Sequence, residues 1–535
     1  MARVAALLPF VYFAVASAQS TSVSWNNVTG TSSTTFPTDV GFLGPVAYAP
    51  HPPFLAQDDK LNSTQPFGNY GIEMRWLPKD ADKSNATSAD IFRNLGTTSP
   101  YHPADDLFPE THGYEVLPEQ CTVKQVHILH RHGARNPTSS THEGAPLFGA
   151  TLWNATKAGK FNASGELEFL NHWNYTLGAE TLVHQGAQEL FDSGVKFYYQ
   201  YGKLLENLTE HKPVLRTTSQ SRMLDTARYW ALGFFGWNAA EKVNLEVLTE
   251  WTGQNITLAP YDGCNNTNVD SYYLGDIASS QWQKVYLKNA IERLQKLVKG
   301  IKLDETLVYG MMSICAYESV AMGYSKFCPL FTKEEFENYE YDIDLQFQGD
   351  YGFMNPTGKA QGIGYVTEFL SRLNNTKFTG PVTDQNSTLD KSTTYFPVDQ
   401  PLYADFTHDD VIHSVLTSLN FTQIADFLPT TKPDPKRRYR SSRVTPFAAR
   451  LVFEVLECKE NNASTKYIRS KINEAVIPMD QDQGCEKRPD GLCKFDDFLQ
   501  HQQKNAYKDA KYDLVCFGKN GTDFTVTGPV RNGTI

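Results

Sequence analysis

The pattern of apolar and polar residues predicts one strand above all others. Residues 123–129 are apolar and partly β-branched, and the run stops abruptly at a turn that contains Gly133 and Pro137. A short apolar run that ends at turn residues is typical of a buried strand. Two further strand-like runs occupy 403–406 and 450–456.

Between these runs, apolar residues recur every three or four positions, which is the spacing of one face of a helix. The stretches with this spacing are 187–198, 227–235 and 287–298. We interpret their aromatic residues as core packing. Strands that alternate with helices, around a helix-rich middle, predict an α/β fold with a mixed α/β-sheet domain and a largely helical second domain.

The N-terminus has the parts of a secretory signal peptide. Arg3 gives a basic start, residues 4–15 are apolar, and residues 16–18 read Ala-Ser-Ala, a small-residue pattern typical of a cleavage site. The apolar run is too short to span a bilayer, and no later segment approaches the roughly 20 apolar residues that a spanning helix needs. We therefore predict a secreted, extracellular protein that has no membrane partner.

The rest of the chain is divided by composition and periodicity. In chain order the predicted parts are a signal peptide at 1–18, a mostly irregular N-terminal extension at 19–115, an α/β domain at 116–180 and 330–516, a largely helical domain at 181–329, and a polar C-terminal tail at 517–535.

Charge and composition exclude some partners and indicate the compartment. The formal net charge is −11, whereas a nucleic-acid binder normally has a basic excess, so we expect no nucleic-acid partner. About fifteen Asn-x-Ser/Thr sequons indicate a glycoprotein. The eight cysteines fit disulfides in an exported protein, although the sequence alone leaves their pairing open. None lies in a CxxC pair of the kind that binds zinc.

Candidate chemistry is concentrated in residues 131–137, Arg-His-Gly-Ala-Arg-Asn-Pro, directly after the predicted strand. The guanidinium groups of Arg131 and Arg135 are always charged, and their forked geometry suits phosphate oxygens. They flank His132, whose neutral imidazole can attack phosphorus and leave again at mildly acidic pH. The neighbouring positive charges should lower the pKa of this imidazole and keep it neutral. His132 is therefore the candidate nucleophile.

A metal site built from His127, His130 and His132 is the alternative interpretation of this region. Alternate residues of a strand share a face, but His127 does not share it with the other two. The flanking arginines also repel a cation. We therefore expect no metal and no other cofactor.

Cleavage of a phosphate ester also needs an acid, because an alkoxide leaves poorly unless it is protonated as the bond breaks. His408 and Asp409 follow the strand-like run 403–406. At the end of a strand, His408 is suited to hold the phosphate and Asp409 to protonate the leaving oxygen. A His-Asp dipeptide alone is a weak signal, but together with residues 131–137 it predicts a phosphatase site.

These motifs resemble those of the histidine acid phosphatase family, and within it the fungal phytases. The family carries an RHGxRxP loop and a distant HD pair, and the similarity covers residues 95–516 approximately. The resemblance implies a mixed α/β domain and a mostly helical one, with the active site in the cleft between them. The site residues that it implies are the nucleophile His132, the proton donor Asp409, and the phosphate ligands Arg131, Arg135, Arg222 and His408.

Arg222 enters this set only through the resemblance, as the second arginine of a family segment of the form RxxxxxR that begins here at Arg216. Without the family, it would be interpreted as a solvated residue at a helix start. The cysteines also match family positions. The disulfides implied in this way are Cys121–Cys458, Cys264–Cys516, Cys315–Cys328 and Cys485–Cys493.

The chain departs from the phytase pattern at several places. Phytases often have lysines after the RHGxRxP loop, where this chain has residues 139–143, and a second lysine pair where it has Gln346 and Phe347. Asp410 replaces a common Asn, and we expect it to raise the pKa of Asp409. The basic run 436–443 is interpreted as a solvated loop, with substrate contact and proteolytic processing as alternatives.

The sequence as a whole predicts a secreted histidine acid phosphatase that hydrolyses phosphomonoesters through a phosphohistidine. Its expected partners are small-molecule phosphate esters, with phytate (myo-inositol hexakisphosphate) the expected substrate. Two alternatives stay open: a broad-specificity acid phosphatase with little preference for phytate, and a secreted glycoprotein that binds phosphate without catalysis. A mutase with the same RHG loop is disfavoured by the signal peptide and the HD pair.

Overall fold

The computed structural model describes residues 89–526, with gaps at 140–142, 207, 209–210, 252, 262, 269–272, 381–382, 461–462 and 520–522. All of these residues belong to one unit of the fold, residues 54–535. The predicted signal peptide, most of the predicted N-terminal extension and the end of the predicted tail lie outside the described residues.

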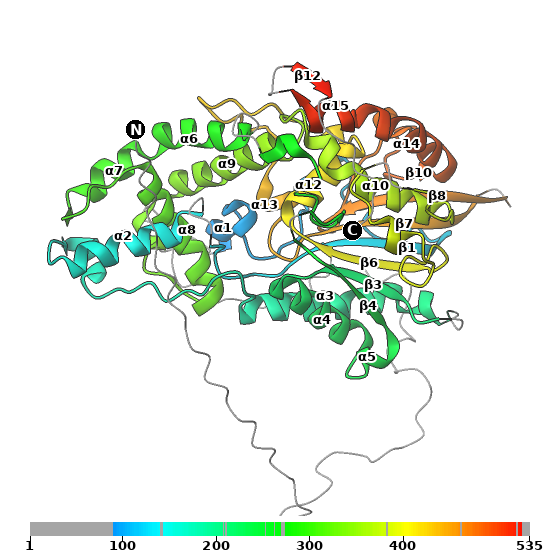
Figure 1. The fold of residues 1–535 in the computed structure, drawn as a ribbon, viewed down its shortest axis with the longest axis horizontal. Helices are drawn as coiled ribbons and strands as arrows, with labels where there is room; N and C mark the ends of the chain where they lie inside the picture. The colour runs from blue at the N-terminus through cyan, green and yellow to red at the C-terminus, as the bar shows by residue number, and fades with distance from the viewer. Residues whose placement is uncertain are drawn as a thin grey trace, which may run out of the picture. The chain divides into compact units, whose positions relative to one another are not determined.

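A mixed β-sheet forms the centre of the fold (Figure 1). Its strands follow the order β10-β8-β7-β1-β6-β3-β4, and β9 pairs with β8. The strands β1, β6, β3 and β4 run parallel to one another, whereas β7, β8 and β10 join by antiparallel pairing. Their bounds are β1 Cys121–Arg131, β3 Val214–Thr218, β4 Asn244–Leu248, β6 Leu402–Thr407, β7 Arg450–Glu460, β8 Ala463–Ile472, β9 Ala475–Val476 and β10 Cys493–Lys494.

The predicted strands at 123–129, 403–406 and 450–456 are confirmed as β1, β6 and β7. β1 lies in the middle of the sheet, between β6 and β7, and its second half is buried without interruption. A strand that is covered on both faces has no solvent side on which to place polar residues, which explains its continuous apolar sequence.

Helices cover both faces of the sheet (Figure 1). One face carries α3 (His184–Tyr201) and α4 (Ser221–Phe235), which pack closely against each other. The opposite face carries α10 (Gly358–Leu373), α12 (Asp409–Ser418) and α14 (Phe495–Ala510). The helices predicted at 187–198 and 227–235 are therefore confirmed as α3 and α4. The third predicted helix is shorter than expected, because α7 ends at Gln295 and the chain then forms β5.

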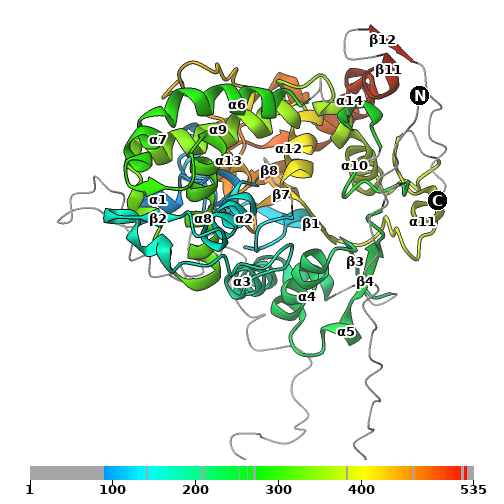
Figure 2. The same ribbon diagram turned by 60° about the vertical axis from the view of Figure 1, so that its left-hand side comes forward.

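A second group of helices lies to one side of the strands in both ribbon views (Figures 1 and 2). Its members are α2 Ala145–Lys157, α6 Leu274–Tyr286, α7 Lys288–Gln295, α8 Glu305–Met322 and α9 Lys333–Asp350. α6 and α9 approach closely where Gly275 meets Gly349, since a Cβ on Gly349 would lie 2.4 Å from the Gly275 Cα. The range 181–329 was expected to be largely helical, yet β3 and β4 within it belong to the central sheet. We propose that the helical part consists of α2 and of the segment from α6 to α9.

Shorter elements connect these layers. They are α1 Ala89–Phe92, the 3-10 helices Gly96–Thr98, Pro109–Thr111, Gly165–Asn171, Gly202–Leu205, Asn265–Asn268, Cys328–Leu330, Thr422–Ile424 and Gln481–Gln483, the helices α5 Ala239–Lys242, α11 Ser387–Asp390, α13 Ser441–Val444 and α15 Tyr512–Phe517, and the strands β2 Asn162–Ala163, β5 Val298–Lys299, β11 Gly518–Lys519 and β12 Asp523–Val526. Within the described part of the chain, no helix has the length and apolar character needed to cross a membrane.

All eight cysteines are paired. The disulfides are Cys121–Cys458, Cys264–Cys516, Cys315–Cys328 and Cys485–Cys493, the same pairs that the family resemblance implies. The first of them joins β1 to β7 at directly opposed positions of the antiparallel pair. Four disulfides are typical of a protein that matures in an oxidising compartment.

Candidate active site

The candidate residues gather at one edge of the sheet, because four parallel strands end there. β1 ends immediately before His132, and β6 ends immediately before His408. β3 leads into α4, which carries Arg222 in its first turn. β4 ends two residues before Glu250. Ligands of α/β proteins bind outside the carboxyl ends of parallel strands, so this edge is the expected place for a site.

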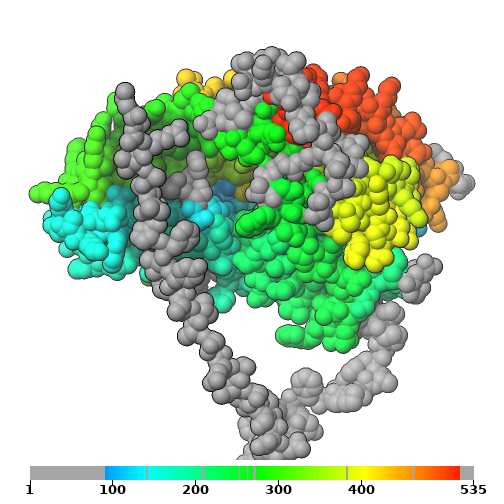
Figure 3. Space-filling view, viewed as in Figure 1, coloured from blue at the N-terminus to red at the C-terminus, as the bar shows by residue number. Residues whose placement is uncertain are grey.

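A cavity of about 850 Å³ opens at this edge. Five of the six predicted site residues line it, and these are His132, Arg135, Arg222, His408 and Asp409. The same cavity is lined by residues of α6 and α9, so it lies between the sheet edge and the second helix group. In the space-filling view the surface is recessed between the bright green segments of α6 and α9 and the cyan segments below them (Figure 3). His132 and Asp409 thus face the same cavity.

His132 is buried, and its contacts orient the ring. Its Nδ1 lies 2.9 Å from the carbonyl oxygen of Gly133, so the neutral ring carries its proton on Nδ1 and has its lone pair on Nε2. Burial lowers the pKa of His132 well below its ordinary value, and the charges of Arg131, Arg135 and Arg222 lower it further. The ring is therefore neutral and nucleophilic even in acid.

Gly133 is required by close packing rather than by the sharp turn expected from the sequence. It is absent from the residues of the described chain with a positive φ. A Cβ at this position would lie 2.4 Å from the Leu190 side chain and 2.5 Å from the Gly186 carbonyl oxygen, both on α3. A larger residue would therefore push the His132 loop away from α3.

Arg131 lies behind the cavity, where it is fully buried and held on several sides. Its Nη1 donates to the carbonyl oxygens of Thr97 and Thr445. Its guanidinium also lies over the ring of Phe447, at 4.8 Å from the ring centre. Its Nη2 donates to Asp409 Oδ2 at 2.5 Å. Arg131 thus links the nucleophile loop to the candidate acid.

Each of the other cationic ligands is also paired with a carboxylate. Arg135 Nη2 lies 2.9 Å from Glu143, and Arg222 Nη1 lies 2.6 Å from Glu180. The third pair consists of His408 Nε2 and Glu250 Oε2, which are 3.1 Å apart. This last contact uses Nε2 of His408 and leaves Nδ1 for a phosphate oxygen.

Asp409 and Asp410 have opposite pKa shifts. Burial alone raises the pKa of Asp409, but the charges of Arg131 and Arg135 outweigh it and hold the pKa below the ordinary value. Asp410 does not reverse this shift, because the charges of the arginines dominate. That Asp410 makes the pKa of Asp409 higher than an Asn would stays a prediction. Burial, together with the charge of Asp409, instead raises the pKa of Asp410 to about 6.

Residues 122–473 match the family model of the histidine phosphatase superfamily (branch 2). The chain belongs to this superfamily. Phytase A of Aspergillus oryzae is 33% identical over 429 residues, which are 76% of this chain and 86% of the relative. An acid phosphatase of Schizosaccharomyces pombe is 29% identical over 424 residues, with coverage of 77% and 86%.

Solved structures agree with the fold. The crystal structure of the phytase from D. castellii has a TM-score of 0.63 at 25% identity and covers 79% of this chain and 88% of its own. The Bifidobacterium longum multiple inositol polyphosphate phosphatase, in complex with inositol hexasulfate, has a TM-score of 0.54 at 13% identity and covers 76% and 96%. The α/β fold class predicted from the sequence is confirmed.

The two arginines of the segment 216–222 have different places in this histidine phosphatase. Arg222 lines the cavity, as the family resemblance implies. Arg216, on β3, is buried under the sheet edge, where it binds Asp405 at 2.9 Å and Glu368 at 2.7 Å. Arg216 is therefore a structural ion-pair residue, and only Arg222 is available to a ligand.

The histidines that suggested a metal site have protein partners. His127 stacks on Tyr403, with ring centres 4.6 Å apart, and His130 Nε2 lies 2.8 Å from Ser193 Oγ. Burial lowers the pKa of both rings to about 3. Both histidines therefore belong to the packing around β1.

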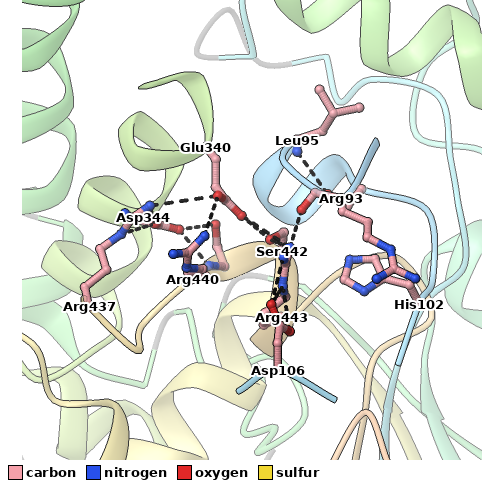
Figure 4. A network of polar contacts seen from close by, with 12 residues as sticks. Arg93, Leu95, His102, Asp106, Glu340, Asp344, Arg437, Arg440, Ser442 and Arg443 are labelled. Atoms are coloured by element: carbon pink, nitrogen blue, oxygen red, sulfur yellow. Dashed lines mark hydrogen bonds and ion pairs between the residues drawn. The ribbon is translucent and has the colours of Figure 1, made fainter. Parts of the chain in front are cut away.

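Within the basic run 436–443, Arg437 and Arg443 are buried and bound by acidic groups of the protein (Figure 4), whereas Lys436 and Arg438 are exposed. Two nitrogens of Arg437 lie 3.1 and 2.9 Å from Asp344 of α9. Arg443 Nε lies 3.1 Å from Asp106. Among the described residues that line the cavity, none belongs to this run. These contacts argue against both a substrate contact and a processing site at the buried arginines.

The carboxylate partners of the site cations are the functional residues that the sequence did not reveal. Glu180 and Glu250 lie far along the chain from Arg222 and His408, and no motif marks them. Glu250 had one usable signal, since it follows the strand-like segment 244–248. Glu143 belongs to residues 139–143, where phytases often have lysines. Its pairing with Arg135 becomes visible only in the fold.

Proposed function

We propose that this histidine phosphatase hydrolyses phosphate monoesters in two steps through a phosphohistidine on His132. The observation that carries the proposal is the arrangement in one cavity of a neutral buried imidazole, two guanidinium groups and the carboxyl group of Asp409. A site that only bound phosphate would need neither the nucleophile nor the acid. This supports catalysis over the binding-protein alternative.

In the first step, Nε2 of His132 attacks phosphorus in line with the leaving oxygen. The P–O bond to the alcohol breaks as the N–P bond forms, and the leaving oxygen takes a proton that Asp409 delivers. The Nδ1–H···O contact with Gly133 stabilises the positive charge that the ring gains on phosphorylation.

In the second step, water attacks the phosphohistidine on the face vacated by the alcohol. The Asp409 carboxylate now accepts a proton from the water, and the N–P bond breaks to release inorganic phosphate and neutral His132. The two steps together return His132 and Asp409 to their starting states, as catalysis requires.

The cationic residues stabilise the transferring phosphoryl group, because charge spreads over its equatorial oxygens in the transition state. We propose Arg131, Arg135, Arg222 and His408 for this role. A bound phosphate also interacts with the positive charge of Arg131 and so weakens the ion pair between Arg131 and Asp409. The weaker ion pair raises the pKa of Asp409, which helps its carboxyl group to hold the proton that it must donate.

Inositol phosphates are the first candidate substrates, because relatives named phytase share about a third of their residues with this chain. A broad range of phosphomonoesters is the second candidate, favoured by the lining of the cavity. No lysine occurs among the described lining residues, and the two arginines there are accompanied by six carboxyl groups. A pocket with so few free cations should attract a polyphosphate weakly.

Release of phosphate from an aryl phosphate at acidic pH, with and without EDTA, tests the proposed function. We expect release at the same rate in both conditions, because a phosphohistidine mechanism uses no metal. Failure to release phosphate from any ester would overturn the function. Loss of activity in EDTA that zinc or magnesium restores would replace it with a metal-dependent mechanism.

We further propose that the protein is secreted, on the evidence of the predicted signal peptide and of the four disulfides. Expression in a eukaryotic secretory host followed by N-terminal sequencing of the protein in the medium is expected to find a mature chain that begins at Gln19. Retention of the activity inside the cells would contradict secretion.

A further inference from the structure

Glu143 holds Arg135 in a fixed ion pair at the wall of the cavity. Its two carboxylate oxygens lie 2.9 and 3.4 Å from the guanidinium nitrogens of Arg135. The backbone N–H of Thr138 donates to the same carboxylate at 2.7 Å. Burial raises the pKa of Glu143, but the charge of Arg135 outweighs this and keeps the pKa below its ordinary value. Glu143 is therefore ionised at mildly acidic pH.

Glu180 holds Arg222 in a similar way from another loop. Its Oε2 lies 2.6 Å from Arg222 Nη1. Its Oε1 accepts hydrogen bonds from the backbone N–H of Ser139 at 2.8 Å and from the Ser139 hydroxyl at 3.2 Å. Both glutamates thus bind the loop that follows the nucleophile, and both face the cavity.

These pairs still leave the arginines able to bind one phosphate. A guanidinium group has five N–H donors, and a carboxylate uses only one or two of them. The remaining donors can hold oxygens of the reacting phosphate. Beyond that phosphate, however, a bound molecule meets the carboxylates themselves, together with Asp276 on α6.

Much of the remaining wall is aromatic, alongside uncharged polar residues such as Thr98, Ser313 and Gln346. The aromatic lining residues are Tyr261, Tyr273, Tyr309, Tyr317, Tyr339, Phe347 and Tyr351. Such a wall suits the ring or the apolar part of an alcohol. It offers no charge that would bind a second phosphate group.

We propose that Glu143 and Glu180 are specificity-determining residues. Their carboxylates offset the charges of Arg135 and Arg222, so that these arginines bind the reacting phosphate but do not attract the other phosphate groups of a polyphosphate. The pocket then prefers esters with a single phosphate on an aromatic or uncharged alcohol over inositol hexakisphosphate. This inference rests on the proposed phosphatase function and names the substrate class of the same site.

The test compares the variants Glu143→Gln, Glu180→Gln and the double variant with the wild-type enzyme. The measured quantity is the ratio of kcat/KM for phytate to kcat/KM for 4-nitrophenyl phosphate at one ionic strength. We expect the ratio to rise about tenfold or more in the double variant, since glutamine keeps the shape but removes the repelling charge; a tenfold change is about 1.4 kcal/mol. A slightly displaced arginine would lower kcat/KM for both substrates alike. Because such a common loss cancels in the ratio, it would not produce the expected rise.

Glu457→Gln is the matched control. Glu457 also forms an ion pair, with Lys124 at 2.9 Å, but it lies at the surface and does not line the cavity. Its substitution removes as much charge as either single substitution in the cavity and should leave the ratio as it is. An equal rise in this control would show that net charge, and not the two pairs, sets the preference.

Competitive inhibition by myo-inositol hexakissulfate, measured with the aryl substrate, gives a readout that does not depend on phytate turnover. The inhibition constant is expected to fall in the double variant and to stay constant in the control. Unchanged ratios and inhibition constants in an active enzyme would overturn the role of the glutamates while leaving the phosphatase function intact. A wild-type enzyme that hydrolyses neither ester would instead overturn the function itself.

Discussion

Replacing His132 with alanine is expected to reduce phosphate release from every ester by at least about 10⁴-fold, because the substitution removes the imidazole that forms the covalent intermediate. The substitution removes a side chain that faces the cavity, so the fold should survive it. Single-turnover assays of inorganic phosphate, with circular dichroism and thermal unfolding as checks on the fold, measure the effect.

A histidine elsewhere on the protein provides the control. His211 is partly exposed and contacts Asp399, and its substitution by alanine should leave phosphate release at the wild-type rate.

Acid quenching of the wild-type enzyme during turnover should trap no stable phosphate, whereas alkaline quenching should retain phosphate on residue 132, since phosphohistidine is labile in acid. Wild-type activity in His132→Ala would end the assignment of the nucleophile.

Replacing Asp409 with asparagine should slow esters of ordinary alcohols by about 10²- to 10⁴-fold, which is the range of general acid catalysis. The loss should be far smaller for 2,4-dinitrophenyl phosphate, whose leaving oxygen needs no proton. A plot of log kcat/KM against the pKa of the leaving alcohol should therefore be steep for the variant and shallow for the wild type. An equal loss across the whole series would assign Asp409 to binding instead of proton donation.

The same residue predicts the pH dependence of the wild type. Because Arg131 and Arg135 keep Asp409 ionised in the free enzyme, the transferred proton must arrive with the monoanionic ester. A phosphate monoester loses that proton near a pKa of about 6, so kcat/KM should fall about tenfold for each pH unit above this value. In Asp409→Asn the fall should flatten for the dinitrophenyl ester. A wild-type profile that is flat from pH 5 to about 8 would contradict this account.

The features that could be predicted from the sequence are those encoded within a few consecutive residues. The apolar run of β1 and the motif around His132 are examples, and so is the HD pair, which directly follows β6. Parallel pairing then brings these strand ends together, since Arg131 lies opposite Thr407 in the register of β1 and β6. The fold class and the superfamily followed correctly from these patterns.

The features that could not be predicted depend on residues far apart in the chain. Glu180 is 42 residues from Arg222, and Glu250 is 158 residues from His408. No local pattern shows which carboxylate will meet which cation. For the same reason the net lowering of the Asp409 pKa could not be predicted, because the neighbour in sequence, Asp410, was visible and the anchored guanidinium of Arg131 was not.

The basic run 436–443 shows a further limit. Four arginines within eight residues predict a solvated loop when only the sequence is known, because buried charges are rare. Here Glu340 and Asp344 of α9 supply buried carboxylates that bind Arg437, and Asp106 binds Arg443. A run of one charge is buried when a second element carries the opposite charge at matching positions.

The anchoring of Arg131 has a consequence for where this enzyme begins. One of its two carbonyl anchors belongs to Thr97, and the segment around Thr97 is tied down by Arg443, which binds the Arg93 carbonyl and the Asp106 carboxylate (Figure 4). Thr97, Arg93 and Asp106 all precede position 122, where the superfamily match starts. A chain trimmed to the matched region would keep every residue of the RHG motif. Its Arg131 would nevertheless lose the carbonyl group of Thr97, one of the two that its guanidinium binds. We therefore expect the smallest catalytically active piece to include residues that precede the superfamily match.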